Sequence, residues 1–354
     1  MEILIDKLGF KQCEVDQAVF IKKSGDTLVI IVVHVDDCTI AATSPALVMQ
    51  LKERLKKHVE ITDLGELHWL LGIVVTCNQD ERTISLSQRS YIDSIIRRFN
   101  FDELKPVSTP MEPHLKLHLN QSPSTGAEYA TMQHIPYREA IGSLMYAALG
   151  TRPDISYAIA TVSRFSTNPG MPHWDAVRRV YRYLIGTKEL RLTYGGEVKP
   201  LAGYTDAYGS MVEDRRAISG YAFLIDGGAM SWSSKKQEIV LLSTTESEYV
   251  AATHAAKEAL WLRSLIAELF APLAQPVTLF SDNQSTIALA KDHQYHAHTK
   301  HIDVHFHFIH WVVNDGKLRL IFCPTDDMVA NTLTKALPSP KVKHFAAELG
   351  LRTA

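Results

Sequence analysis

The chain has 354 residues, of which 46% are hydrophobic, and a formal net charge of −2 at pH 7. This length predicts about two domains, and the hydrophobic content is ample for packed cores, so we expect a soluble globular protein. The nearly balanced charge does not by itself indicate a nucleic-acid partner, and such binding would have to come from local clusters of lysine and arginine.

Cysteine usage and apolar runs narrow the class further. The four cysteines form no CxxC pair, which argues against a disulfide framework and a thiolate zinc site and fits a reducing compartment. No apolar run reaches the ~18 residues of a membrane span. The N-terminus, MEILIDKLGF, lacks the pattern of a signal peptide. We therefore expect no membrane partner.

The first strong feature is the stretch Leu28–Thr43, LVIIVVHVDDCTIAAT, in which two apolar runs meet at Asp36 and Asp37. Apolar runs of this length joined at a polar pair predict a buried β-hairpin. Adjacent aspartates at a tight turn are commonly turn formers. They are also candidate metal ligands, and the sequence pattern alone leaves both interpretations open.

Helical and linker segments follow the hairpin. Residues Pro45–His58 carry leucines at steps of four and predict an amphipathic helix that covers the sheet. Residues Lys105–Gly126 are polar and contain several Pro, Ser and Gly residues, so they are the best candidate for a linker. From Tyr137 to Thr187 the pattern is again helical. This segment holds three arginines at helical spacing that contact a nucleic-acid backbone or form a solvated face, namely Arg178, Arg179 and Arg182.

After Gly195 and Gly196 the order of candidate strands and helices predicts a mixed sheet with helices on its faces. Two strand-like runs end on an aspartate, LAGYTD at Asp206 and VTLFSD at Asp282. Between them a long helical segment starts at Thr244 and carries Glu248 near its beginning. The order is thus strand-end aspartate, helix glutamate, strand-end aspartate.

Glu248 begins the core-facing row of its helix, which continues through Ala252, Ala255, Ala259, Leu262, Ile266 and Leu269. A lone carboxylate on a buried row is costly unless it is paired or bound to metal, so we expect a cation near it. The alternatives are that Glu248 closes a capping box with Thr245 and that Asp282 is the N-cap of the following helix.

Acids that are brought together in one site repel each other as anions, and divalent cations relieve this repulsion. Carboxylate oxygens are hard ligands that favour Mg²⁺ or Mn²⁺ over zinc. Two such ions, roughly 3.5–4 Å apart, activate a water and stabilise the leaving oxygen in an in-line attack on phosphorus. Asp206, Glu248 and Asp282 are therefore candidate ligands of two Mg²⁺ or Mn²⁺ ions.

Several long sequence segments, which occur in a fixed order, resemble those of one protein family. The region from 200 to 340 resembles the ribonuclease H domain of copia-type retrotransposon polyproteins. Its words are YTDA (204–207), SGYAFLIDGGAMSWSSKKQ (219–237), STTESEYVAA (243–252), SDNQSTIALA (281–290), HTKHIDVHFHFIHWVV (298–313) and ANTLTKAL (330–337).

The N-terminal region carries the same family's polymerase words. The segments GFKQCEVDQAVFIKKSGDTLVIIVVHVDD, LGELHWLLGIVV and ISLSQRSYIDSIIRRF resemble the later palm and the start of the thumb of a copia-type reverse transcriptase. The helical segment from Tyr137 to Thr187 resembles the thumb-to-connection segment of the same family.

The resemblance implies an α/β (α+β) fold, with a truncated polymerase palm hairpin and a helical thumb and connection, followed by a ribonuclease H-like mixed sheet with flanking helices. It implies four parts. They are a partial reverse transcriptase palm with the start of the thumb (1–104), a linker with the helical thumb and connection (105–196), the ribonuclease H-like domain (197–340) and a tail (341–354).

The resemblance also implies an activity, the Mg²⁺- or Mn²⁺-dependent hydrolysis of the RNA strand of RNA–DNA hybrids, with Asp206, Glu248 and Asp282 as catalytic metal ligands. Contacts to the 2′-hydroxyl would then distinguish RNA from DNA, and Lys235 with Lys236 are further candidates for nucleic-acid binding. The implied partners are the hybrid and the remaining polymerase or integrase parts of the polyprotein. The implied location is intracellular, in cytoplasmic virus-like particles and in the nucleus.

Two positions depart from the family pattern. The family hairpin reads Tyr-Val-Asp-Asp and its aspartates hold the metal ions of nucleotide transfer, whereas here His34 replaces the tyrosine before Asp36 and Asp37. Such a site needs another carboxylate from an earlier palm strand, so we do not expect polymerase activity. The fourth ribonuclease H carboxylate of the family is Asn331 here, which keeps one oxygen but loses the charge and predicts a slower enzyme that holds one ion weakly.

Two other functions stay open. The chain is a catalytically silent, domesticated or decayed fragment that binds nucleic acid or a polymerase partner, or it is a residual RNA-directed DNA polymerase. Binding of a hybrid without cleavage favours the first alternative. Primer extension in the presence of template, nucleotides and Mg²⁺ favours the second.

Overall fold

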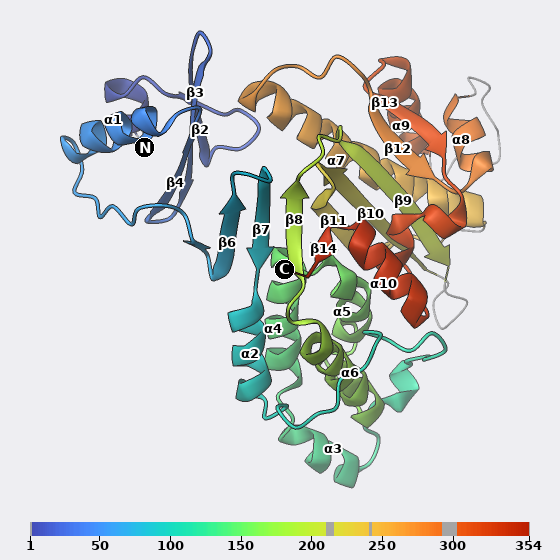
Figure 1. Cartoon of the computed structure of the whole chain (residues 1–354). Coiled ribbons are helices and arrows are strands. Elements are labelled where there is room, and N and C mark those ends of the chain that lie inside the picture. The colour runs from blue at the N-terminus through green and yellow to red at the C-terminus, as the bar shows by residue number, and fades with distance from the viewer. Residues whose placement is uncertain (1, 210–215, 241–242, 292–302, 354) are drawn as a thin grey trace. The chain divides into compact units, whose positions relative to one another are not determined.

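The computed structural model describes residues 2–209, 216–240, 243–291 and 303–353 of the chain (Figure 1). The chain divides into two compact units, one made of Met1–His68 with Glu258–Gln275 and one made of Trp69–Lys257 with Pro276–Ala354. Each unit combines a β-sheet with helices, so the predicted α/β class is confirmed. Among the described residues, none of the helices combines the length and the apolar character that a bilayer crossing requires.

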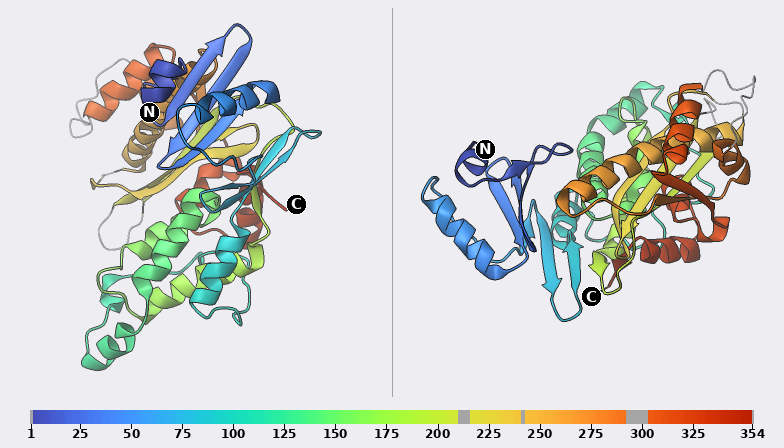
Figure 2. Two further views of the ribbon diagram at one scale, coloured as in Figure 1. Left: turned by 90° about the vertical axis from the view of Figure 1, so that its left-hand side faces the viewer. Right: turned by 90° about the horizontal axis from the view of Figure 1, so that it is seen from above.

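The first unit is built on a four-stranded antiparallel sheet with the order β1-β2-β3-β4. The strands of this N-terminal sheet are blue in Figure 2. Its strands are β1 (Lys11–Gln12), β2 (Val19–Ser24), β3 (Thr27–His34) and β4 (Asp37–Ala42), and a short π-helix, η1 (Ile3–Lys7), precedes them. The predicted hairpin is β3–β4, in which His34 pairs with Asp37. Its turn is exposed, with Val35 83% accessible and at a positive φ of 55°. The predicted hairpin is therefore confirmed, but the burial predicted for it holds only for strand residues such as Val29 and Ile31 and not for its turn.

Residues that alternate along β2 and β3 bury both faces of this sheet. On one face, Val29 and Ile31 pack against Leu51 and Leu55 of helix α1 (Pro45–Lys56), which confirms the amphipathic helix predicted there. On the other face, Cys13, Val19 and Ile21 pack against two leucines from the end of helix α7 (Thr244–Leu269), namely Leu265 and Leu269. The first unit therefore includes a segment about two hundred residues distant in sequence.

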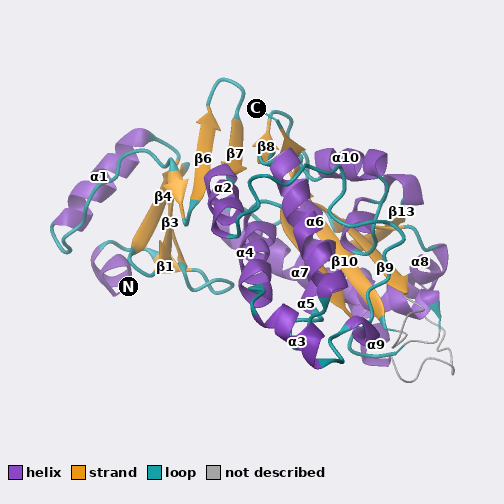
Figure 3. Ribbon diagram, turned by 90° about the horizontal axis from the view of Figure 1, so that it is seen from below, coloured by secondary structure: helices purple, strands orange, loops and turns teal. Residues whose placement is uncertain are grey.

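The second unit contains a small antiparallel sheet with the order β14-β8-β7-β6-β5 and a group of helices. The strands are β5 (Trp69–Leu70), β6 (Ile73–Asn78), β7 (Thr83–Ser87), β8 (Arg191–Gly195) and β14 (Leu351–Arg352). The helices are α2 (Arg89–Arg98), α3 (Gly126–Gln133), α4 (Tyr137–Gly150), α5 (Ser156–Ser163) and α6 (Met171–Thr187). Figure 3 shows α2, α4, α5 and α6 side by side.

One polar network lies inside this helical group. The guanidinium of Arg152 and the carboxylate of Asp154 are both fully buried and are joined by two hydrogen bonds of 3.0 and 2.7 Å. Tyr183 donates a third hydrogen bond to Asp154, and Thr187 accepts from Arg152. Because every charged group in it is paired, the network joins the turn before α5 to α6 without leaving an isolated charge.

The second sheet of this unit has the order β11-β10-β9-β12-β13. Its strands are β9 (Ala202–Gly209), β10 (Ala217–Ile225), β11 (Gly228–Lys236), β12 (Val277–Ser281) and β13 (Leu318–Phe322). The first three are antiparallel neighbours, whereas β12 runs parallel to both β9 and β13, which gives the predicted mixed sheet.

The remaining helices of this unit are α7, α8 (Gln284–Lys291), α9 (Asp303–Asn314) and α10 (Ser339–Glu348), and α7 and α10 lie on opposite faces of the mixed sheet (Figure 1). Two short 3₁₀ turns, η5 (Thr325–Asp327) and η6 (Val329–Leu333), connect β13 to α10. A single hydrophobic core joins the helical group to this sheet through Ala222, Ala229 and Phe345. The candidate site is thus held by a sheet that is packed on one continuous core.

Candidate metal site at the edge of the mixed sheet

The two aspartates lie where the parallel strands β9 and β12 separate. The pairing between these strands runs only as far as Tyr204 and Phe280. Asp206 follows two positions later on β9, and Asp282 lies one residue beyond the end of β12. Crevices beyond the carboxyl ends of parallel strands are the usual ligand sites of such sheets. The sequence predicted that the first strand ends at Asp206, but β9 continues to Gly209 because its antiparallel pairing with β10 continues.

Glu248 reaches the same place from α7. It lies in the second turn of that helix and is 6% exposed, and its Oε2 accepts a hydrogen bond of 3.0 Å from the backbone N–H of Ala207. One carboxylate oxygen from each of Asp206, Glu248 and Asp282 lies within 4.8 Å of the other two. Three acids from three elements, distant in sequence, are therefore brought together.

The helical alternatives do not hold in the structure. Glu248 bonds to the strand and not to Thr245, and Asn283 caps α8 instead of Asp282, since its Oδ1 accepts a hydrogen bond from the N–H of Thr286 at 3.0 Å. The side chain of Asp282 instead accepts a hydrogen bond of 2.9 Å from the hydroxyl of Thr325. The carboxylate of Glu248 is thereby oriented by a backbone N–H of β9, and that of Asp282 by a hydroxyl of η5.

The three carboxylates repel one another as anions, and this repulsion adds to the effect of burial on the pKa of Glu248. Burial and, after it, the charges of the neighbouring carboxylates of Asp206 and Asp282 together raise the pKa of Glu248 to about 9. Burial also raises the pKa of Asp206, while Lys335 and Thr334 act in the opposite direction. Carboxyl groups that hold protons so tightly lack sufficient positive charge around them, and a divalent cation supplies it.

The segment ANTLTKAL (330–337) contributes further side chains to the site. Thr334, fully buried, donates its hydroxyl to Asp206 Oδ2, and the ammonium of Lys335 lies 3.6 Å from the same oxygen. This close approach depends on Gly220, the residue paired with Asp206 on β10, because a Cβ there would lie 2.7 Å from Thr334 Cγ2. Lys335 is thus a cation of the acidic group, and its ion pair is with Asp206. Sequence reasoning missed Thr334, Lys335 and Gly220, although all three lie inside words that it singled out.

Asn331 lies in η6 and is 2% exposed. Its Nδ2 donates a hydrogen bond of 2.7 Å to the carbonyl of Thr325, whose hydroxyl in turn holds Asp282. Its buried Oδ1 has no hydrogen-bond partner among the described residues. An oxygen left without a partner at this depth costs stability unless a ligand completes it.

This donor set fits a divalent cation. The three carboxylates supply hard, negatively charged oxygens within bonding reach of a common ion, and the Asn331 carboxamide oxygen is a further hard donor in the neighbouring turn. Within the part of the chain that the structure describes, this is the one group of three or more acidic, His or Cys side chains so arranged.

The other predicted ligands, Asp36 and Asp37, lie at the exposed turn of the β3–β4 hairpin in the first unit. No third acid, His or Cys from the described residues joins them in such a group. Their role as metal ligands of a polymerase remnant stays a prediction.

The predicted nucleic-acid contacts have protein partners. Arg178 pairs with Asp175 at 3.3 Å, and Arg182 donates to the carbonyl of Lys105 at 2.7 Å. Arg179 pairs with Glu112 at 2.5 Å and also bonds Thr109 at 2.9 Å. These three arginines line a surface pocket of about 650 Å³ together with Glu103, Lys105, Glu112 and Asp175.

On β11, Lys235 pairs with Glu238 at 3.1 Å, and Lys236 faces Ile218 of β10 in register. The binding of nucleic acid by the five basic residues stays a prediction.

The sequence of the chain matches a family model and several known proteins. A family model described as reverse transcriptase (RNA-dependent DNA polymerase) matches residues 1–113. The retrovirus-related Pol polyprotein from transposon TNT 1-94 of Nicotiana tabacum is 42% identical over 340 residues, which is 96% of this chain but 26% of that protein. The chain thus spans about a quarter of the length of that relative.

A second relative matches over most of its own length. The putative transposon Ty5-1 protein of Saccharomyces cerevisiae is 31% identical over 72% of this chain and 81% of its own. Among solved structures, LC11-RNase H1 in complex with an RNA/DNA hybrid aligns with 38% of this chain and 94% of its own at 17% identity and a TM-score of 0.31. On the two sequence relatives, this chain belongs to the copia-type retrotransposon Pol polyprotein family.

Proposed function

We propose that this chain is a divalent-metal-dependent ribonuclease that hydrolyses the RNA strand of RNA–DNA hybrids. The observation that carries the proposal is the convergence of Asp206, Glu248 and Asp282, with one oxygen of each within 4.8 Å of the others. Membership of a Pol polyprotein family supports a phosphodiester as the bond that is cleaved. Hard carboxylate ligands support Mg²⁺ or Mn²⁺ as the cofactor.

In this proposal the three carboxylates hold the cofactor, which when bound supplies an activated water and balances charge on the phosphate. The chain's own contribution is orientation. The backbone N–H of Ala207 holds Glu248, the hydroxyl of Thr334 holds Asp206 and the hydroxyl of Thr325 holds Asp282. Each carboxylate is therefore oriented by a hydrogen-bond donor of the protein before the cation binds. This preorganisation lowers the entropy that is lost when the cation binds.

The substrate is proposed from the family and from chemistry. A hybrid presents an RNA strand whose 2′-hydroxyl groups distinguish it from DNA. The other parts of the polyprotein are proposed as partners. The division at residues 104, 196 and 340 into polymerase, connection, nuclease and tail stays a proposal as well. Two ions are predicted from the sequence.

One observation favours the silent alternative. Asn331 occupies the position of the family's fourth carboxylate, so the site has less negative charge than the family pattern provides. With this reduced negative charge, the protein would bind the hybrid without cleaving it. The residual polymerase alternative rests on the two carboxylates at the β3–β4 turn.

The deciding experiment incubates the full chain with labelled RNA–DNA hybrid, duplex DNA and duplex RNA, each with Mg²⁺, Mn²⁺ or EDTA. We expect cleavage of the hybrid's RNA strand alone and none in EDTA. Hybrid binding with no cleavage in either metal would support the silent alternative. A parallel reaction with primer, template and nucleotides tests the polymerase alternative, and we expect no extension.

A further inference from the structure

The position of Lys335 is unusual for a site that is expected to hold two divalent ions. Its ammonium lies 3.6 Å from Asp206 Oδ2, the oxygen that also accepts the Thr334 hydroxyl. The side chain is 24% exposed, against 3% for Asp206, so the ion pair is largely shielded from water. One oxygen of the shielded Asp206 carboxylate thus has an ammonium and a hydroxyl beside it, and the ammonium occupies space in which a metal ion would bind that oxygen.

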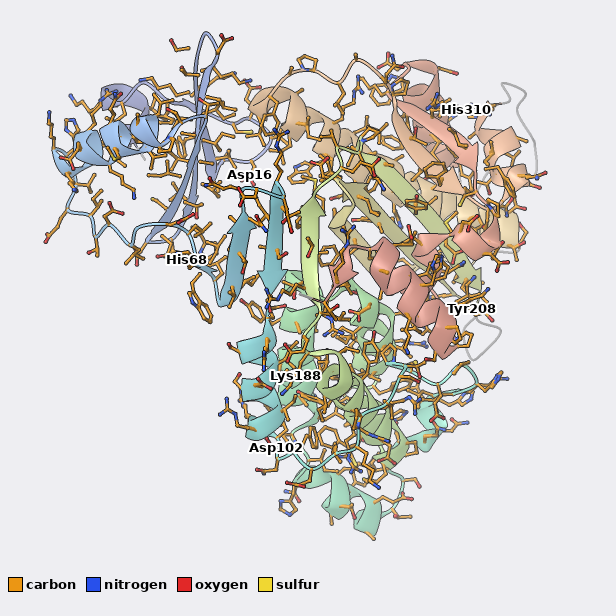
Figure 4. The ribbon with its side chains drawn as sticks, in the orientation of Figure 1. Asp16, His68, Asp102, Lys188, Tyr208 and His310 are labelled. Carbon is orange, nitrogen blue, oxygen red and sulfur yellow. The ribbon has the colours of Figure 1, made fainter. Side chains whose placement is uncertain are left out.

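A second contact fixes the lysine. The ammonium lies 5.4 Å from the centre of the ring of Tyr208, which is on the same strand as Asp206, two residues further along (Figure 4). An ammonium over an aromatic face at this distance gains a cation–π attraction. Lys335 is therefore held between a carboxylate and a ring that both belong to β9, and its direction is set by the strand that carries the catalytic acid.

The charges of the site favour one divalent ion. Asp206, Glu248 and Asp282 carry three negative charges when ionised, and the Lys335 ammonium leaves two of them to be balanced. One divalent cation balances these two, whereas two would leave the buried site with an excess of positive charge. Asn331 is neutral, and its Nδ2 is engaged by the carbonyl of Thr325, so it adds no charge for a second ion.

We propose that the Lys335 ammonium takes the place of one of the two cations, so that this chain binds a single divalent ion. The inference rests on the proposed function, because it concerns the same acidic site. It replaces the expectation of two ions with one ion and one lysine. Lys335 is then a positioning residue, which neutralises Asp206 and keeps the second position closed to metal.

The test counts ions. Mn²⁺ is titrated into the full chain without substrate, with calorimetry and the electron paramagnetic resonance signal of free Mn²⁺ as readouts. We expect one Mn²⁺ per wild-type chain. The variant Lys335→Met, which keeps the aliphatic stem but removes the charge, is expected to bind two.

Lys335→Arg is the matched control, because it keeps the charge in a larger head group, and it should still bind one ion. Near-ultraviolet circular dichroism checks that each variant is folded, and Lys335→Gln replaces Lys335→Met if the latter is not. Two ions in the wild type, or one ion in the folded uncharged variant, would overturn the inference.

The same proteins are assayed on the hybrid, which separates the two proposals. If the counts are as expected but no protein cleaves RNA, the proposed activity fails and the inference about the ions stands. If the wild type cleaves RNA and binds two ions, the proposed activity stands and the inference fails.

Discussion

Thr334 donates its hydroxyl to the carboxylate of Asp206 although 128 residues separate them in sequence, and both side chains are buried. The bond joins the turn after β13 to the middle of the mixed sheet. We predict that Thr334→Val, which keeps the shape and removes the donor, leaves Asp206 less well oriented. Loss of a hydrogen bond to a charged group costs about 1.5–3 kcal/mol, so the affinity for Mn²⁺ should fall roughly ten- to hundredfold.

Calorimetry with Mn²⁺ measures this change. Thr334→Ser keeps the hydroxyl and is the control, and it should bind Mn²⁺ nearly as tightly as the wild type. Equal losses in the serine and valine variants would mean that packing of the threonine methyl, and not the hydrogen bond, matters at this position.

The three acids give a second prediction. Asp206→Asn, Glu248→Gln and Asp282→Asn each remove one anionic ligand and preserve shape, so we expect hybrid cleavage to fall by about a hundredfold or more while the fold is retained. Cleavage rate in Mg²⁺ is the measurement. Asp315→Asn is the matched control, since Asp315 forms a half-exposed ion pair with Lys317, and it should cleave at the wild-type rate. Full activity of Asp282→Asn would refute the ligand assignment.

A third prediction concerns Asn331. Asn331→Asp restores a charge next to the acidic group and should raise the cleavage rate at low Mg²⁺, by removing a defect of ~1–3 kcal/mol if it resembles the loss of a charged hydrogen-bonding partner. Rates across a Mg²⁺ series are the measurement. The exposed neighbour Asp327, in η5, is the control position. An unchanged rate in Asn331→Asp together with no cleavage in Asp327→Asn would make Asp327 the fourth ligand.

The pKa of Glu248 gives a fourth prediction. Burial, followed by the charges of Asp206 and Asp282, raises this pKa from 4.5 to about 9 in the metal-free fold. Between those values the unfolded chain has released the proton and the folded chain keeps it, so the contribution to stability is complete below pH 4.5 and is lost as the pH rises to about 9. We therefore expect the free energy of unfolding in EDTA to fall across this window.

Urea denaturation at a series of pH values measures this fall. It should be markedly smaller in Glu248→Gln, which cannot titrate. Mg²⁺ requires the ionised carboxylates, so the stabilisation that it adds should grow with pH in the same window. A pH dependence identical in the wild type and Glu248→Gln would show that other groups dominate.

The buried ion pair of the helical group gives a fifth prediction. Asp154→Asn leaves the fully buried guanidinium of Arg152 without its counter-charge, and this should cost about 3–5 kcal/mol of unfolding free energy. Tyr183→Phe removes only one hydrogen bond to the same carboxylate and should cost about 1 kcal/mol. Urea denaturation compares the two. Similar costs would indicate that the carboxamide introduced by Asp154→Asn still satisfies the guanidinium.

The three acids of the candidate site were predictable because local patterns reveal them. The apolar runs before Asp206 and Asp282 end abruptly on a charge, and Glu248 begins a helical row most of whose later members are buried as expected. The roles of Thr334 and Lys335 were not predictable in this way. They depend on a short turn that folds back onto β10, and nothing in the local spacing of ANTLTKAL shows which strand it contacts.

The extent of β9 illustrates a second limit. A strand that pairs with two neighbours ends at different residues on its two sides, and the parallel side stops at Tyr204 while the antiparallel side continues to Gly209. Sequence periodicity reports an alternation of faces but not which neighbour is present. The pairing of β14 with β8 has the same cause, since it joins residues about 160 positions apart.

The contribution of α7 to the first unit has a consequence for synthesis on the ribosome. The chain emerges in order, so the apolar face formed by Cys13, Val19 and Ile21 stays uncovered until Leu265 and Leu269 have been made. At about 5–20 residues per second this interval lasts roughly 10–50 s. During translation the nascent sheet is thus a substrate for chaperones that hold apolar surfaces, and its face is covered only when helix α7, which carries Glu248 in its second turn, has been made.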